Sequence, residues 1–299
     1  MTATATPLSD IMTQFAHDVM HGQPPVRWPC GRGGLARWPL GPGRIVLVGG
    51  GPGAGKTALA MQLVCDAVRR HEDLRALICN VEMPISALLE RQLARLSQVP
   101  LTQIQTRTVA PGDRAALRRG LATIEELADR LFFAQPPFSM VRLTEAAAEH
   151  NASLILLDYL QRIAPPPGEY RDKRSATSAT MESLRMLATA GAGILAVSAV
   201  GRARDAKGRT GYDALNLASF KETGEIEYGA DDAYLLLPAP PELGRDGRPT
   251  GTIAVTARHV KARYGEPVDL LLQFERRTQR FTEMGVPQQE DEEEDGQIT

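Results

Sequence analysis

The stretch Arg44–Leu63, RIVLVGGGPGAGKTALAMQL, decides the fold of this 299-residue chain. Its opening run, RIVLV, predicts a buried β-strand, and KTALAMQLV has the apolar spacing of an α-helix. Between them lies the pattern Gly50-x-x-x-x-Gly55-Lys56-Thr57. Its glycines let the backbone curl around a phosphate, Lys56 can reach the β- and γ-phosphate oxygens, and the Thr57 hydroxyl can bind Mg²⁺. Strand, glycine-rich loop and helix in this order predict a P-loop that binds ATP and Mg²⁺.

Apart from Asp158, which is discussed below, the residues assigned to the nucleotide belong to this loop and the start of its helix. A glycine-rich turn that contains Lys-Thr by chance is the alternative for them. The assigned set is Gly50, Gly53, Gly55, Lys56, Thr57 and Ala58.

Outward from this stretch, short apolar runs alternate with helical patterns. The runs that predict strands are RIVLVG, ALIC, RLFFA, LILLD, GILAVS and AYLLL, and the helices between them include KTALAMQLVCDAVRR, DRAALRRGLATIEELADR and TMESLRMLATA. This alternation predicts an α/β fold with a largely parallel sheet and helices on both faces. Two further strands, in GTIAVTARHVKARYG and PVDLLLQF, are expected to be antiparallel. Residues 135–142 and 164–180 are expected to be loops, and the sequence assigns them no role.

Two acids follow apolar runs where this fold would place a ligand. LILLD ends in Asp158, and a Mg²⁺ beside a P-loop needs such an acid at the end of another strand. Glu82 comes just after the run ALIC. Since ligands lie beyond the carboxyl ends of the strands in such a sheet, Glu82 can orient and deprotonate the water that attacks the γ-phosphate. The alternative is that Glu82 is a cap or surface charge before the helix PISALLERQLARL.

The ends of the chain differ from its centre in composition. Residues 8–21 have a helical apolar stripe, followed by a segment rich in Pro, Gly and Trp. The apolar face of that helix can be buried on its own domain or on a neighbouring subunit. Six consecutive acids, Glu290–Asp295, indicate a solvated, disordered tail. We therefore expect a linker helix and connector over residues 1–40, one ATPase domain over 41–284 and an acidic tail over 285–299.

Bulk composition is typical of a soluble enzyme. The net charge of −2 includes the six acids of the tail, so the rest of the chain is mildly basic, which suits a polyanionic partner. The sequence has no apolar run of membrane-spanning length and no signal-peptide pattern at its start, so we expect a cytoplasmic protein without membrane contact. The three cysteines include no C-x-x-C pair, which favours reduced thiols over a disulfide or zinc site.

Several motifs together resemble one family. VEMP with LLERQLARLSQV, then EHNASLILLDYLQ, GEIEYGADDAYLL and VKARYGEPVDLLLQF, are similar to successive motifs of the RecA-like C-terminal ATPase domain of DnaB-type replicative helicases. The resemblance spans residues 40–282. It implies a RecA-like P-loop NTPase that assembles as a hexameric ring, with ATP between subunits and single-stranded DNA through the centre. Since only about forty residues precede the P-loop, we expect the family's N-terminal helical domain to be missing, and residues 8–21 resemble its linker helix.

The resemblance also implies roles for individual positions. Lys56 and Thr57 hold phosphate and Mg²⁺, Glu82 activates the attacking water, and Asp158 belongs to the Mg²⁺ shell. Two cations of HVKARYG, Lys261 and Arg263, reach the nucleotide of the neighbouring subunit, where an arginine in trans accelerates hydrolysis by about 10³ to 10⁵. Ordinary exposed cations are the alternative for this pair.

The family's DNA-contact loop resembles FKETGEIEYGAD. Its basic, acidic and glycine positions fall on Lys221, Glu222 and Gly224, which can bind successive phosphates. The upstream segment GRARDAKGRTG adds cations to the same channel, although a solvated loop is nearly as good an interpretation. Few aromatic residues accompany them, which favours a grip on the DNA backbone with little sequence preference. These added cations are Arg202, Arg204, Lys207 and Arg209.

Two interpretations of function remain. The first is an ATPase motor on single-stranded DNA, a stand-alone DnaB-type helicase domain with a possible loader or replication partner. The second is a RecA-like ATPase that switches nucleic-acid or protein partners without unwinding. The second is favoured by Ala199, because the family usually has Gln there, which senses the γ-phosphate, and alanine has no side-chain donor. A nucleotide-binding scaffold without turnover is disfavoured because the expected hydrolytic groups are present.

Overall fold

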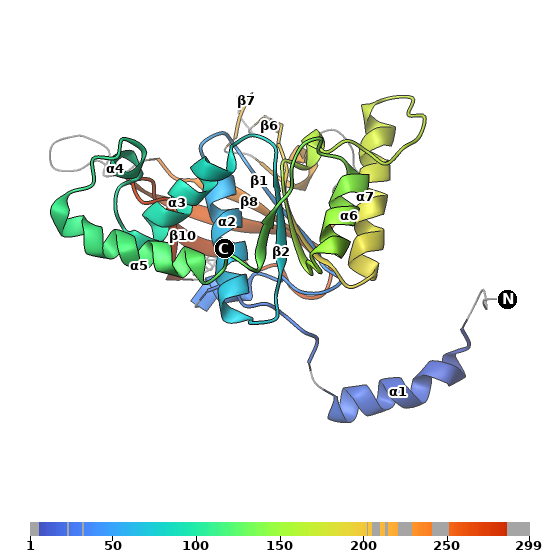
Figure 1. Cartoon of the computed structure of the whole chain (residues 1–299). Helices are drawn as coiled ribbons and strands as arrows, with labels where there is room; N and C mark the ends of the chain where they lie inside the picture. The colour runs from blue at the N-terminus through green and yellow to red at the C-terminus, as the bar shows by residue number, and fades with distance from the viewer. Residues whose placement is uncertain are drawn as a thin grey trace, which may run out of the picture.

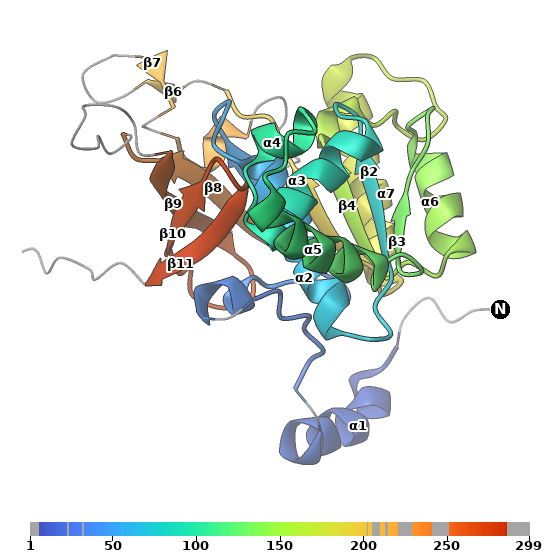
Figure 2. The ribbon, with the colours of Figure 1, turned by 60° about the vertical axis from the view of Figure 1, so that its left-hand side comes forward.

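A twisted nine-stranded sheet forms the centre of the part of the chain that the computed structural model describes (Figures 1 and 2). These residues are 6–22, 24–31, 33–201, 203–204, 210–212, 215–220, 229–240 and 251–285. The strand order is β11-β10-β9-β8-β1-β5-β4-β2-β3. The P-loop strand β1 therefore lies in the middle of the sheet, between β8 and β5.

The parallel part of the sheet confirms the predicted fold class. It consists of β1 (Ile45–Gly50), β2 (Ala76–Asn80), β3 (Leu131–Phe133), β4 (Leu154–Asp158), β5 (Gly193–Val197) and β8 (Asp232–Pro238). Three antiparallel strands extend it, namely β9 (Thr252–Ala262), β10 (Leu270–Glu275) and β11 (Arg280–Gly285). The sequence predicted β9 and β10 but not β11. A separate two-stranded ladder pairs β6 (Ala203–Arg204) with β7 (Thr210–Gly211), in a segment expected to be a loop.

Helices cover both faces of the sheet (Figure 1). On one face lie α2 (Lys56–Arg70) and α3 (Ile85–Ser97), and α4 (Leu101–Gln105) and α5 (Arg114–Glu125) pack outside α3. On the other face lie α6 (Met140–Glu149) and α7 (Lys173–Thr189). Single turns of 3₁₀-helix complete the described elements: η1 (Gly33–Arg37), η2 (Pro111–Asp113), η3 (Leu160–Arg162) and η4 (Leu217–Ser219).

The two cores follow from the period-2 alternation of side chains along buried strands. In β1, Val46 and Val48 pack into the core under α2, whereas Ile45 and Leu47 pack into the core under α6 and α7. Because both faces are covered, every residue of β1 is buried. This explains why the predicted strands are continuous apolar runs rather than alternating ones.

Two helices begin inside segments that the sequence analysis treated as loops. Ser139 caps α6 by accepting a hydrogen bond from the Arg142 N–H, and Asp172 caps α7 in a capping box with Ser175. The first turns of α7 are polar and carry no apolar stripe, so the prediction placed the start of this helix too late. The caps specify these starts locally.

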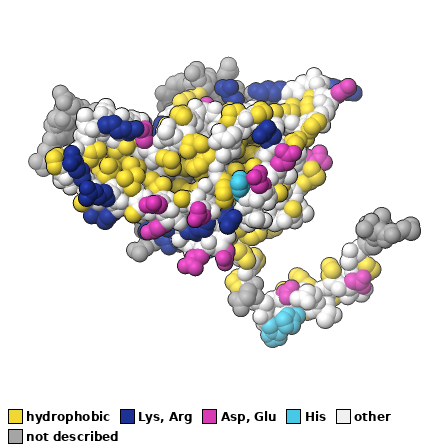
Figure 3. All heavy atoms as spheres, viewed as in Figure 1, with side chains coloured by type: hydrophobic (Ala, Val, Ile, Leu, Met, Phe, Trp, Pro, Cys, Tyr) yellow, Lys and Arg dark blue, Asp and Glu magenta, His cyan; other side chains and the backbone are white. Residues whose placement is uncertain are grey.

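The N-terminal segment has two parts that behave differently. The connector after α1 (Leu8–His21) packs on the domain, with Trp28, Cys30, Trp38 and Leu40 buried in its core. In contrast, α1 has no buried residue and projects away from the body of the molecule (Figures 1 to 3). Across the described residues, no helix combines the length and the apolar character required to span a membrane.

Candidate nucleotide-binding site

The P-loop links the end of β1 to the start of α2. Gly53 and Gly55 have φ angles of 76° and 87°, a region that side chains other than glycine disfavour. A Cβ atom at Gly55 would also lie 2.7 Å from the Phe281 ring, so only glycine fits there. The Lys56 ammonium donates hydrogen bonds to the carbonyl oxygens of Gly50 at 2.9 Å and Gly51 at 3.0 Å. The loop is therefore curled around its own lysine, next to the N-terminus of α2.

Asp158, at the end of β4, lies against the start of α2. One of its oxygens, Oδ2, accepts hydrogen bonds from the Thr57 hydroxyl at 2.7 Å and from the Asn80 amide at 2.7 Å. Asp158 is only 1 % exposed. The strand register brings Asp158 to Asn80, because β4 pairs with β2 so that these two residues are level.

Burial in this cluster disfavours the charged forms of both Asp158 and Lys56. Burial raises the pKa of Asp158 to about 6, with the Thr57 hydrogen bond acting in the other direction and the charge of Glu82 adding to the rise. Burial likewise lowers the pKa of Lys56, while the carboxylates of Asp158 and Glu82 partly restore it. Charges that are costly on their own would be stabilised by a ligand of complementary charge.

Asp158 and Thr57 fit a Mg²⁺ bound together with phosphate. The second oxygen of Asp158, Oδ1, is buried and has no hydrogen-bond partner among the described residues. A buried, unpartnered carboxylate oxygen beside a threonine hydroxyl is a donor set suited to Mg²⁺, directly or through water. No cluster of three or more His, Cys, Asp or Glu side chains forms a metal site in the described ranges.

A pocket of about 610 Å³ opens in front of the P-loop. The sequence predicted the P-loop side of this pocket but missed the other side, which contains Arg91 on α3, Phe274 on β10 and Gln279. Arg91 donates a hydrogen bond to Gln279 Oε1 at 3.3 Å, which ties α3 to the turn between β10 and β11. The lining consists of Pro52, Gly53, Gly55, Lys56, Thr57, Ala58, Arg91, Tyr159, Phe274, Arg276 and Gln279.

Glu82 lies beyond the end of β2, at the same edge of the sheet. Its N–H donates to Asn80 Oδ1 at 3.1 Å. The charge of its carboxylate raises the pKa values of Lys56 and Asp158. Burial and a hydrogen bond with Glu82 raise the pKa of Tyr159 to about 12, so Tyr159 stays a neutral phenol at the wall of the pocket. Glu82, Lys56, Thr57 and Asp158 are therefore brought together at the carboxyl edge of the sheet.

Lys261 and Arg263 do not join this group. The register pairs Ala262 with Asp232 at the start of β8, and Asp232 is level with Val46 at the start of β1. The two cations thus lie at the edge of the sheet opposite the P-loop. There Arg263 forms an ion pair with the buried carboxylate of Asp231 at 2.9 Å, which Arg185 of α7 also contacts at 3.0 Å.

The predicted DNA contacts can be placed only in part. Arg204 belongs to the short strand β6, and nothing is described of its side chain. The remaining members of the set lie outside the described residues: Arg202, Lys207, Arg209, Lys221, Glu222 and Gly224.

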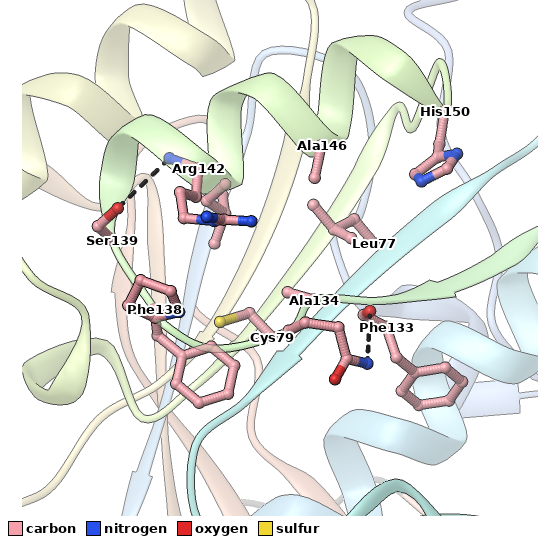
Figure 4. Close-up of a pocket in the computed structure, with 12 residues that line it drawn as sticks. Leu77, Cys79, Phe133, Ala134, Phe138, Ser139, Arg142, Ala146 and His150 are labelled. Carbon is pink, nitrogen blue, oxygen red and sulfur yellow. Dashed lines mark hydrogen bonds between the residues drawn. The ribbon is translucent and has the colours of Figure 1, made fainter.

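The segment 135–142, which had no assigned role, lines a second pocket between α6 and strands β2 and β3 (Figure 4). This cavity of about 170 Å³ is separate from the P-loop pocket. Arg142 contributes from α6 and His150 from the position just after its end, and Phe133 and Phe138 flank the pocket from the β3 side. No Asp or Glu lines this pocket.

A P-loop on the central strand of a largely parallel sheet, with an acid at the end of a neighbouring strand, defines a P-loop nucleotide-binding fold. Residues 38–283 match the family model of the DnaB-like helicase C terminal domain. The chain therefore belongs to this family, which confirms the resemblance seen in the sequence.

The chain spans less than half the length of either curated relative that it matches here. Replicative DNA helicase DnaB of Pasteurella multocida is 29 % identical over 197 residues, which are 62 % of this chain and 40 % of that protein. DNA mismatch repair protein MutS of Cereibacter sphaeroides is 33 % identical over 179 residues, which are 57 % of this chain and 20 % of that protein.

Two solved structures share the fold. The structure of a DnaB-like replicative helicase, reported with its interactions with primase, has a TM-score of 0.73 and 17 % identity, covering 94 % of this chain and 67 % of that one. A solved ATPase domain also has a TM-score of 0.73, with 18 % identity, covering 94 % of this chain and 99 % of that one. At these identities the likeness concerns the fold.

Proposed function

We propose that this protein is an ATP-hydrolysing motor that acts on single-stranded DNA, a DnaB-like helicase or translocase domain. The observation that carries the proposal is the cluster of Lys56, Thr57, Glu82 and Asp158 at one edge of the sheet. Together these residues supply a phosphate cation, a Mg²⁺ site and a base for water. Membership of the DnaB-like family supports the choice of DNA as the partner.

The chemistry follows from the contacts of each group. Lys56 would exchange the carbonyl oxygens of Gly50 and Gly51 for phosphate oxygens when ATP enters. Thr57 and Asp158 would hold Mg²⁺, which neutralises charge on the β- and γ-phosphates. Glu82, on the segment between β2 and α3, would orient the attacking water and accept its proton. The N–H groups of the P-loop would bind the phosphates at the start of α2.

The positions of Lys261 and Arg263 support a site shared between two subunits. A cation at the opposite edge of the sheet cannot reach the P-loop of its own chain, but it can reach that of a neighbour in a head-to-tail ring. In that arrangement Arg263 stabilises charge on the γ-phosphate in trans, with Lys261 beside it. We therefore propose a homo-oligomer, a hexameric ring, in which nucleotide binds between subunits.

The helix α1 gives this assembly a second contact. Its apolar side chains are open to solvent, with Phe15 60 % and Val19 67 % exposed. An apolar groove of about 590 Å³ lies between α6 and α7, lined by Met140, Val141 and Leu187 among others. We propose that α1 of one copy occupies this groove on the next copy, because the exposed face of α1 and the groove are both apolar. Each copy would then bury the side chains that its own domain leaves exposed.

Single-stranded DNA would pass through the ring along the proposed contact loop. Lys221, Glu222 and Gly224, with Arg202 and Arg204 upstream, would track the phosphates, so binding should weaken as salt rises.

A RecA-like ATPase that switches partners without unwinding is the second candidate, and one observation favours it. Ala199, just beyond β5, is exposed and has no side chain that can hydrogen bond. The Gln161 side chain contacts this position. Its Oε1 accepts a hydrogen bond from the Ala199 N–H at 3.1 Å, and its Nε2 donates to Ser198 Oγ at 2.8 Å. In this candidate the Gln161 side chain does not take over the role of the family's Gln at position 199, which senses the γ-phosphate. Hydrolysis would then be uncoupled from DNA.

Steady-state ATP hydrolysis, with and without single-stranded DNA at two salt concentrations, separates the two candidates. We expect DNA to stimulate the wild type, and both higher salt and Lys221→Ala to reduce that stimulation. Hydrolysis that is indifferent to DNA would favour partner switching. Light scattering that shows a monomer in the presence of ATP would overturn the shared site.

A further inference from the structure

Asn80, the last residue of β2, bridges two parts of the site. It is buried, with 9 % of its surface exposed. Its amide nitrogen donates to Asp158 Oδ2 at 2.7 Å. Its carbonyl oxygen accepts from the N–H groups of Glu82 at 3.1 Å and Met83 at 2.7 Å. One uncharged side chain therefore connects the Mg²⁺ carboxylate with the backbone that carries the candidate base.

The amide of asparagine suits this bridge because its nitrogen donates and its oxygen accepts, and both are held in one rigid plane. Aspartate at this position would set an acceptor against Asp158, and alanine would leave both partners without their bond. Only the four residues Val81–Pro84 lie between the end of β2 at Asn80 and the start of α3 at Ile85. The two hydrogen bonds to Asn80 therefore fix a large part of this short segment.

We propose that Asn80 is a positioning residue for hydrolysis, which holds Glu82 at a set distance and angle from Asp158. The inference rests on the proposed function, because it assigns to Glu82 the activation of water. Asn80 is not among the residues that line the nucleotide pocket, so it would act on the reaction through its neighbours. Its loss should affect the chemical step, where an error of about 1 Å in position can cost about 100-fold in rate.

The test compares Asn80→Ala, Glu82→Gln and the double variant, with turnover and nucleotide affinity measured separately at saturating Mg²⁺. A fluorescent ATP analogue gives the affinity. Ser97→Ala is the matched control, since Ser97 Oγ also accepts a backbone N–H two residues later, from Val99 at 3.2 Å, and lies at the far end of α3. It removes the same kind of contact at a place remote from the P-loop.

We expect Asn80→Ala to lower kcat by about 10- to 100-fold. The dissociation constant should stay within about threefold of the wild type, since the P-loop contacts remain. In the Glu82→Gln background the same substitution should change kcat by less than about twofold, because a residue that acts through Glu82 has nothing left to position. Ser97→Ala should leave kcat unchanged.

Two results would overturn the inference. One is wild-type turnover in Asn80→Ala, and the other is an equal proportional loss of kcat on replacing Asn80 whether or not Glu82 is present. The second would show that Asn80 supports the fold or the metal site independently of Glu82. A wild-type protein that does not hydrolyse ATP at all would instead overturn the proposed function, which distinguishes the two failures.

Discussion

Replacing Asp158 by asparagine should remove an electrostatic cost from the nucleotide-free fold. The folded-state pKa of Asp158 is about 6 against an ordinary value of 3.8. A shift of about two units corresponds to about 3 kcal/mol between the two protonation states. Because the folded pKa is the higher one, the folded protein binds the proton more tightly than the unfolded chain does. Its stability therefore falls as pH rises from about 4 to about 6 and is level above that.

Asparagine has no such titration, so its effect should depend on pH. At about pH 8 the Asp158→Asn variant should gain about 3 kcal/mol in free energy of unfolding, because it has no buried charge at this position. A buried amide group in place of the unpartnered Oδ1 should reduce this gain by about 1–3 kcal/mol. At about pH 4.5 the wild type recovers about 2 kcal/mol of this difference by taking up a proton. The change in this stability difference with pH reports the titration of Asp158 alone, because the cost of burying the amide is the same at every pH.

Urea unfolding of both proteins at several pH values, in EDTA and without nucleotide, measures this quantity. Asp172→Asn is the control with the opposite sign, because the hydrogen bonds of Asp172 to Ser175 lower its pKa and its contribution is lost as pH falls. A free-energy difference between Asp158→Asn and wild type that stays constant from about pH 8 to about pH 4.5 would refute the reasoning.

Three further predictions concern turnover and assembly. Glu82→Gln should retain ATP binding but lower kcat by about 10²- to 10⁴-fold in single-turnover assays, and unchanged turnover would remove Glu82 as the base. Arg263→Ala should lower the ATPase rate of the assembled protein by about 10³-fold, whereas Arg258→Ala, which removes an exposed cation from the strand β9 that precedes Arg263, should not. Phe15→Asp should shift light scattering in ATP toward the monomer, because a charge cannot enter the α6–α7 groove without cost, whereas His17→Asp on the polar side of α1 should leave assembly intact.

The sequence predicted what is encoded locally. The strand β1, the P-loop and α2 follow from one continuous stretch, in which glycine spacing and apolar periodicity agree. Asp158 and Glu82 were found because acids after apolar runs fall at the carboxyl edge of a parallel sheet. In each case a short-range pattern and one rule about sheets were sufficient.

The sequence did not predict contacts that depend on pairing between distant residues. Of the two arginines on α3, Arg91 lines the pocket and Arg95 forms an ion pair with Asp66 at 2.8 Å, a difference set by how α3 packs. The turn that supplies Gln279 was missed because β11 presents mainly polar residues around the buried Phe281. Asn80 was overlooked although it stands two residues before Glu82, since only the register of β2 with β4 brings it to Asp158.

The opposite positions of Lys56 and Arg263 on the sheet have a genetic consequence. If each complete site takes Lys56 from one chain and Arg263 from its neighbour, two inactive variants should rescue each other. In rings formed from equal amounts of Lys56→Ala and Arg263→Ala chains, about a quarter of the interfaces would join an intact lysine to an intact arginine. The turnover restored on mixing would thus measure the fraction of interfaces that contain an intact site. A cell that expresses both variants would regain a function that neither provides alone.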